Sequence, residues 1–141
     1  MNKKVLIIDD EDWFIEPILD RLAFEEIVYN YFKTGFEGLM EFKSNSSEYS
    51  VIILDMKLTL GDYPDGIESP EIDTDCSGLY ILKELREINS QIPILCYTVL
   101  HDQKIKNEIT NLGGTHIVKA GRNEDELFDE IHKFISPNKE S

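Results

Sequence analysis

Three carboxylates that follow two short apolar runs are the most informative feature of this sequence. The run 5–8 ends on the acidic pair Asp9 and Asp10, and the run 51–54 ends on the single carboxylate Asp55. Both runs are unbroken and rich in β-branched residues, which is typical of central strands buried on both faces of a parallel sheet. Because the carboxyl ends of such strands border one crevice, we expect these carboxylates to lie close together. Their mutual repulsion favours a hard cation between them, so the pattern predicts a magnesium site.

A hydroxyl and an ammonium group follow two later segments that are expected to be strands. The run 92–97 precedes Thr98, and the run 115–118 precedes Lys119. Together with a metal ion, the lysine would neutralise the oxygens of a transferring phosphoryl group, and the hydroxyl would orient one of them. Asp55 would then act as a nucleophile that forms an acyl phosphate. Taken alone, an aspartate after a strand is also common as a helix cap or turn residue.

The elements that must position these groups alternate along the chain. We expect strands near residues 4–8, 26–31, 51–54, 93–97 and 115–118, with helical apolar spacing between them. Five βα units with right-handed crossovers predict an α/β fold, a doubly wound five-stranded parallel sheet with five helices. Pro17 is tolerated best in an opening turn, so the first helix is expected to begin near Trp13 or later.

Composition narrows the function further. The 141 residues fit one domain, and the net charge of −14 disfavours both nucleic acids and anionic membranes as partners. Two cysteines without metal-ligand spacing fit a reducing compartment; we expect Cys96 in the core and Cys76 in an exposed loop. The sequence shows no signal peptide and no apolar stretch of membrane-spanning length, which predicts a cytoplasmic protein.

The order of an acidic pair, a single aspartate, a threonine and a lysine, each at a strand end, resembles the receiver domain of two-component response regulators. The resemblance runs from Lys3 to about Phe134. It implies a flavodoxin-like sheet of order 2-1-3-4-5 and a phosphorelay in which Asp55 accepts a phosphoryl group from a phosphohistidine. The expected partners are a sensor histidine kinase or histidine phosphotransferase and a downstream protein target. Such a protein is a switch rather than an enzyme, with self-phosphorylation and autodephosphorylation as its only reactions.

The resemblance also implies a metal-ligand set. Asp10 and Asp55 would bind Mg²⁺ directly, together with the backbone carbonyl of Lys57, and Asp9 would bind directly or through water.

A phosphohydrolase of the haloacid-dehalogenase type also uses a strand-end aspartate. That chemistry needs a second aspartate two residues later, where this chain has Lys57.

Switching residues follow from the same resemblance. Thr98 and Lys119 would hold the phosphoryl oxygens, and Thr98 would move together with His116, which occupies the usual aromatic position. The alternative for His116 is a purely structural role, with a backbone partner at the sheet edge. Leu100 lies two residues after the threonine and cannot position an attacking water, which favours a long-lived phosphoryl group.

The chain departs from the family in its loops. We expect a receiver domain over 1–136 with an acidic insertion loop at 58–76, followed by a polar tail at 137–141. The insertion is either a solvated loop or a functional one, and we expect it over or beside the phosphorylation pocket. Ala120 stands where the family has a cis-proline, so we expect a trans peptide there. The insertion, Ala120 and the bulk of Val99 support the alternative of a phosphate-independent pseudo-receiver that acts as a protein-binding module.

Overall fold

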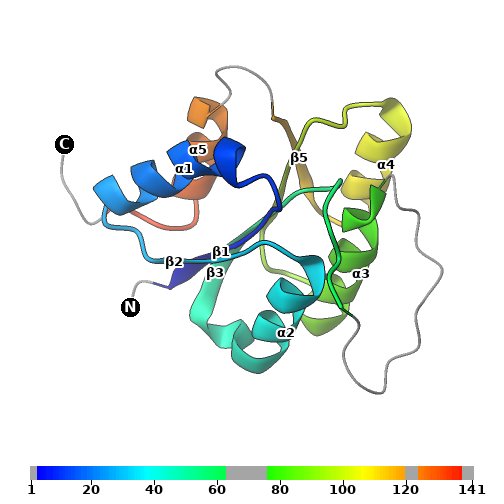
Figure 1. The fold of residues 1–141 in the computed structure, drawn as a ribbon, viewed down its shortest axis with the longest axis horizontal. Helices are drawn as coiled ribbons and strands as arrows, with labels where there is room; N and C mark the ends of the chain where they lie inside the picture. Colours follow the sequence, from blue (N-terminus) through cyan, green and yellow to red (C-terminus); the bar gives the residue numbers. More distant parts are fainter. Residues whose placement is uncertain (1–2, 63–75, 120–123, 138–141) are drawn as a thin grey trace.

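Strands and helices alternate throughout the computed structural model, which describes residues 3–62, 76–119 and 124–137. In these ranges the elements are β1 Lys4–Ile8, α1 Asp12–Phe24, β2 Tyr29–Phe32, α2 Gly35–Asn45, the 3₁₀ turn η1 Ser46–Glu48, β3 Tyr49–Leu54, α3 Gly78–Ile88, β4 Ile94–Thr98, α4 Gln103–Asn111, β5 Thr115–Val118 and α5 Glu124–His132 (Figure 1). All strand pairs are parallel, in the order β2-β1-β3-β4-β5. The predicted doubly wound, flavodoxin-like fold is therefore confirmed.

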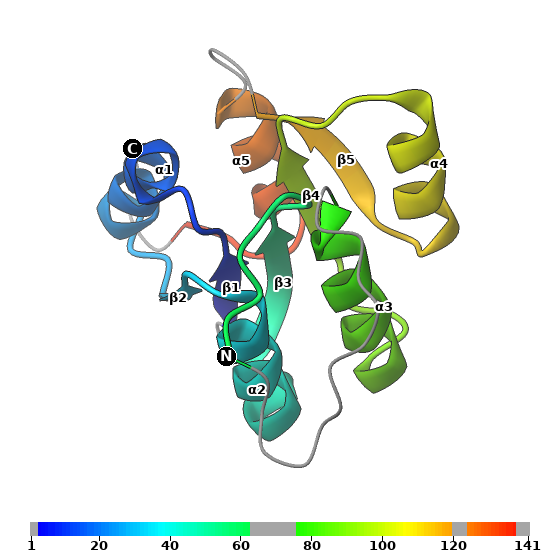
Figure 2. The same cartoon turned by 45° about the vertical axis from the view of Figure 1, so that its right-hand side comes forward.

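Helices cover both faces of the sheet. α1 and α5 pack on one face, and α2, α3 and α4 pack on the other (Figures 1 and 2). Successive strand residues point to opposite faces: in β1, Leu6 and Ile8 enter one core while Val5 and Ile7 enter the other. The unbroken apolar runs thus serve two cores at once, which leaves polar side chains only at the strand ends.

The first helix begins earlier than predicted. α1 starts at Asp12, so Pro17 lies inside the helix rather than in its opening turn. A proline inside a helix removes one backbone hydrogen bond and costs about 3 kcal/mol. Burial of Ile15, Ile18 and Leu22 on the sheet offsets this cost, because each is fully inaccessible to solvent.

The second strand begins later than predicted. β2 starts at Tyr29 and not at residue 26. Glu26 adopts a left-handed conformation with φ of 57°, and the N–H of Ile27 donates to the carbonyl of Leu22 at 2.9 Å. These residues end α1 and turn the chain before β2 can begin. Hydrophobic spacing gives no signal for such a turn.

Two side chains are less exposed than their sequence context suggests. Cys96 lies in the core as predicted, but the prediction of an exposed Cys76 is wrong, because it is buried just before α3. His101 is exposed, whereas His132 is half-buried, with its Nε2 at 2.6 Å from Oε1 of Glu25. Both differences arise because neighbouring elements cover residues whose local sequence is polar.

Several predictions fall on residues outside the described ranges. They concern the body of the insertion at 63–75, the peptide bond before Ala120, and the tail beyond residue 137. The domain boundary at 136 likewise stays a prediction. Within the ranges that the structure describes, no helix has the length and apolar character needed to cross a membrane.

Candidate functional site

The register between β1 and β3 places the first two carboxylates side by side. Ile8 lies opposite Leu54, and the N–H of Asp55 donates to the carbonyl of Ile8 at 3.1 Å. Asp9 and Asp55 follow directly, and each is only 1% exposed. The shared strand edge therefore brings together two carboxylates that are 46 positions apart in the chain.

The register between β4 and β5 adds the hydroxyl and the ammonium group. The N–H of Lys119 donates to the carbonyl of Thr98 at 2.7 Å, which continues the pairing of the two strands. The hydroxyl of Thr98, fully buried, donates to the carboxylate of Asp55. The four predicted strand ends thus meet at one place.

Lys119 is the centre of the cluster. Its Nζ donates to Asp9 at 2.6 Å, to Asp55 at 3.0 Å and to Glu11 at 3.2 Å. An ammonium group has three N–H donors, so these carboxylates engage all of them. The ring of Phe14, whose centroid is 5.2 Å from Nζ, adds a cation–π contact. A fully inaccessible cation is therefore held by carboxylates from two strands and a loop.

Burial sets the protonation of the cluster. It raises the pKa of Asp9 to about 7, with a further increase from the charge of Asp55 and an opposing effect of Lys119. Burial also raises the pKa of Asp55, against the lowering effects of Lys119 and the Thr98 hydroxyl. For Lys119, burial lowers the pKa, but the charges of Asp55 and Asp9 outweigh it and keep the ammonium protonated. The acidic charge exceeds the basic charge here, which favours binding of an additional cation.

Asp10 has a partner that the sequence did not predict. Its Oδ2 accepts hydrogen bonds from the N–H of Thr59 at 3.0 Å and from the hydroxyl of Thr59 at 2.8 Å. Thr59 belongs to the start of the predicted insertion, so the first residues of that segment border the site. The location of its body, 63–75, stays a prediction.

The carboxylates fit a hard cation. Asp9, Asp10, Glu11 and Asp55 each offer an oxygen within 4.8 Å of the others. Clustered carboxylate oxygens are the donors that Mg²⁺ prefers. The backbone N–H of Lys57, another predicted ligand, donates to Oδ1 of Asp55 at 3.2 Å. Its carbonyl as a metal ligand stays a prediction.

The start of α3 is hydrogen-bonded to the residues that directly follow Asp55. The hydroxyl of Ser77 donates to the carbonyl of Leu58 and accepts from the N–H of the same residue. The N–H of Gly78 donates to the carbonyl of Met56 at 2.7 Å, and a Cβ at Gly78 would lie 2.3 Å from the carbonyl oxygen of Asp55. Only glycine allows the helix to begin this close to the acceptor.

The predicted switch residues meet through the loop after β4. The Nε2–H of His116 donates to the carbonyl of Leu100 at 2.7 Å, since a carbonyl can only accept. The N–H of Leu100 donates to Oγ1 of Thr98 at 3.3 Å. His116 therefore has a backbone partner, and both its role as a switch and a purely structural role stay predictions. Val99, which lies between Thr98 and Leu100 in the chain, is 42% exposed.

Sequence reasoning missed two residues of the site. Glu11 follows the acidic pair directly, so a third consecutive carboxylate after the strand was a usable signal. Its N–H also donates to Oδ1 of Asp9 at 2.8 Å, which turns the loop back toward Lys119. Thr59 gave no comparable signal, because its contact with Asp10 depends on the path of the loop after β3.

Several solved structures with the same fold are response-regulator receiver domains. No protein-family model and no curated protein matches the chain. The CheY-like response regulator receiver domain protein from Methanospirillum hungatei JF-1 superposes with a TM-score of 0.75 at 20% identity, covering 94% of this chain and 93% of its own.

Two further similar structures are complexes with magnesium and beryllium fluoride. The response regulator TrrA from Thermotoga maritima, in complex with Mg²⁺ and beryllium fluoride, has a TM-score of 0.68 at 24% identity and covers 93% and 97% of the two chains. The CheY of the CheX–CheY–BeF₃–Mg complex from Borrelia burgdorferi gives 0.71 at 16% identity, with 93% and 87% covered. At these identities the similarity shows that this chain has the receiver-domain fold.

Proposed function

We propose that this protein is a signalling receiver that accepts a phosphoryl group from a partner phosphohistidine onto Asp55 in an Mg²⁺-dependent reaction. The observation that carries the proposal is the buried ammonium of Lys119, which joins Asp9 to Asp55 while the Thr98 hydroxyl donates to Asp55. The receiver fold supports the same function. The partner would be a sensor histidine kinase or a histidine phosphotransferase.

The proposed step is an in-line transfer between two side chains. An oxygen of Asp55 attacks phosphorus, a P–O bond forms, and the P–N bond to the partner imidazole breaks, with the electron pair returning to the imidazole nitrogen. Lys119 turns one N–H from Asp55 to a phosphoryl oxygen, and Thr98 does the same with its hydroxyl. Asp9 keeps its ion pair and so holds Lys119 in place.

Residues of the same cluster would bind the metal ion. Asp10 and Asp55 would hold Mg²⁺ with Asp9 and the carbonyl of Lys57, and the bound ion would neutralise charge on the phosphoryl oxygens. Two of the similar structures are Mg²⁺–beryllium fluoride complexes, which supports a site of this kind here. In this proposal Thr59 must share Asp10 with the ion.

The output of the reaction is a changed surface rather than a released product. On this proposal the protein is a cytoplasmic switch whose only reactions are self-phosphorylation and autodephosphorylation. Thr98 would draw toward the phosphoryl group and pull on Leu100, whose carbonyl is held by His116. A downstream protein target would recognise the rearranged loop between β4 and α4.

Intact-mass analysis after incubation with Mg²⁺ and acetyl phosphate tests the proposal. Wild type should gain one phosphoryl mass, Asp55→Asn should gain none, and an exposed-site control, Asp12→Asn, should label like wild type. Omitting Mg²⁺ should prevent labelling. Equal labelling of wild type and Asp55→Asn would reject Asp55 as the acceptor.

A pseudo-receiver remains the second candidate, favoured by one observation. Glu11 takes the third N–H of Lys119, so no donor of the ammonium is left for a phosphoryl oxygen until a carboxylate is released. If wild type resists both acetyl phosphate and a phosphorylated histidine phosphotransferase, while Glu11→Ala labels, the intact chain acts as a phosphate-independent binding module. Labelling of wild type would reject this candidate.

A further inference from the structure

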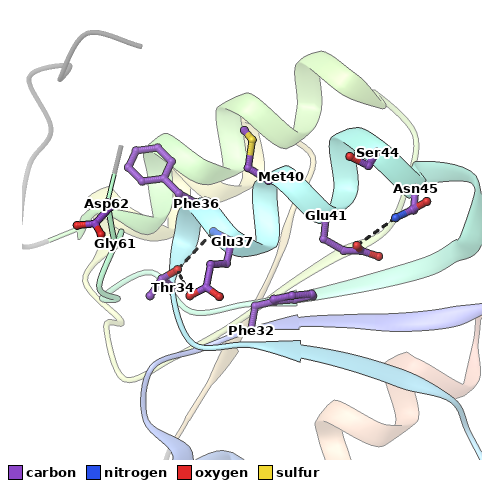
Figure 3. Close-up of a pocket in the computed structure, with 10 residues that line it drawn as sticks. All are labelled: Phe32, Thr34, Phe36, Glu37, Met40, Glu41, Ser44, Asn45, Gly61 and Asp62. Atoms are coloured by element: carbon purple, nitrogen blue, oxygen red, sulfur yellow. Dashed lines mark hydrogen bonds between the residues drawn. The ribbon is translucent and has the colours of Figure 1, made fainter. Parts of the chain in front are cut away.

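A second acidic region lies along α2. A groove of about 810 Å³ is found there, bordered by the end of β2 and by residues 61–62 (Figure 3). Its apolar side chains are Phe32, Phe36 and Met40, and its carboxylates are Glu37, Glu41 and Asp62. None of these residues belongs to the cluster around Lys119.

The groove is elongated. Phe36 and Met40 are four residues apart on α2, as are Glu37 and Glu41, so an apolar ridge and an acidic ridge run next to each other along the helix (Figure 3). Lining residues extend to Asn45 at the end of α2, which at 1.5 Å per residue gives a length of about 14 Å from Phe36. That length suits a segment of polypeptide of two to three helical turns better than a compact small molecule.

Neutral donors hold the two glutamates in place. The hydroxyl of Thr34 donates to Glu37 at 2.8 Å. The amide of Asn45 donates to Glu41 at 3.1 Å, and the hydroxyl of Tyr49 donates to the same carboxylate. Burial raises the pKa of Tyr49, and the hydrogen bond to Glu41 and its negative charge raise it further. These donors fix the carboxylates in position and, being neutral, bring no positive charge to them.

No cation of the described chain balances this charge. Among the described residues, no lysine or arginine forms an ion pair with Glu37, Glu41 or Asp62. No described residue that lines the groove is basic. An apolar floor beside fixed, uncompensated carboxylates is complementary to a ligand with the opposite charge and an apolar side.

We propose that this groove is a docking surface for a positively charged amphipathic segment of a partner protein. Its apolar residues would pack on the partly exposed Phe32 and Met40, and its lysines or arginines would pair with Glu37, Glu41 and Asp62, as in helix-in-groove recognition. The chain's own segment 63–75 follows Asp62 but contains five acidic residues and no basic one. Like charge makes that segment a poor occupant. This inference goes beyond phosphoryl transfer and does not depend on it.

The probe for a binding experiment is a fluorescein-labelled peptide of fifteen residues, built from leucine and lysine with helical spacing. A peptide of the same composition in scrambled order is the matched control. Anisotropy titrations of the full chain should show saturable binding, tighter for the helical peptide. Amide chemical-shift mapping should place the changes in residues 32–45 and 61–62.

Charge variants separate the groove from the overall acidity of the chain. The double variant Glu37→Gln/Glu41→Gln should weaken binding by about fivefold, because each exposed charge pair contributes modestly. The control Glu16→Gln/Asp20→Asn removes two exposed charges from α1 and should change the affinity by less than about twofold. Met40→Asp should also weaken binding, because it places a charge in the apolar floor.

Three results would overturn the proposal. Equal weakening in both double variants would mean that the peptide responds only to the net charge of −14. Shift changes centred on another face would place the binding elsewhere. Binding that appears only after residues 63–75 are replaced by a Gly-Ser linker would assign the groove to the chain's own segment.

Discussion

The strand-end cluster and the α2 groove both gather carboxylates, but they balance the charge in different ways. Asp9 and Asp55 are 1% exposed and share the buried ammonium of Lys119, whereas Glu37 and Glu41 are held by neutral hydroxyl and amide donors. Removing a charge from water is costly unless an opposite charge compensates for it. A buried cluster must therefore include its own cation, while carboxylates at the rim of a groove keep their charge available to a ligand.

One short segment contacts both regions. Thr59 donates two hydrogen bonds to Asp10, and its carbonyl accepts the N–H of Gly35 at the start of α2 at 2.9 Å. Two residues later, Gly61 and Asp62 line the groove. Any movement of Asp10 toward a metal ion would therefore act on the segment that borders the groove.

The largest expected effect comes from removing the buried cation. Lys119→Met should lower the free energy of unfolding at pH 7 by about 3 kcal/mol, because Asp9 and Asp55 would be left buried without an opposite charge. The control Lys33→Met breaks an ion pair with Asp12 that is more than half exposed and should leave stability unchanged. Urea denaturation measures both. If both variants lose the same free energy of unfolding, the buried ion pairs of Lys119 contribute no more to stability than an exposed pair.

The next effect concerns the metal. Asp10→Asn should weaken Mg²⁺ binding by about tenfold, because the ion loses a charged oxygen ligand. Without metal the variant should be more stable than wild type, since the repulsion among the clustered carboxylates is reduced while the acceptor for Thr59 is kept. Urea denaturation with and without Mg²⁺ gives both quantities. Asp62→Asn, in the groove, is the control and should change neither; an unchanged Mg²⁺ affinity in Asp10→Asn would refute its role as a ligand.

A smaller effect is expected at the segment between the regions. Thr59→Val removes the hydroxyl that donates to Asp10 and should lower the free energy of unfolding by about 0.5–1 kcal/mol. Thr59→Ser keeps the hydroxyl and should restore most of the loss. If serine and valine are equivalent, the hydroxyl does not stabilise Asp10.

The smallest effect is expected in the groove itself. Glu37→Gln should change the free energy of unfolding by no more than about 0.5 kcal/mol, because glutamine can still accept from the Thr34 hydroxyl that holds the carboxylate. A loss as large as that of Lys119→Met would show that this groove carboxylate stabilises the fold and does not serve primarily to bind a ligand.

The sequence by itself determined the fold and the convergence of the strand-end residues. Unbroken apolar runs require burial on both faces, and parallel strands connected by helices place all their carboxyl ends at one edge. Asp9, Asp55, Thr98 and Lys119 were therefore predictable as neighbours without coordinates. The start of α1 and the start of β2 were not, because the packing of Ile15 overrides Pro17 and a left-handed Glu26 closes the helix.

Only the tertiary structure decided how these neighbours are connected to the rest of the molecule. The contact of Glu11 with Lys119, the hold of Thr59 on Asp10 and the burial of Cys76 all depend on how loops return across the sheet edge. The α2 groove likewise exists because residues 61–62 lie beside the start of α2 and the end of β2 lies along the same helix. Hydrophobic periodicity specifies which face of an element is buried, but the path of a loop is set by packing and hydrogen bonds between residues distant in the chain.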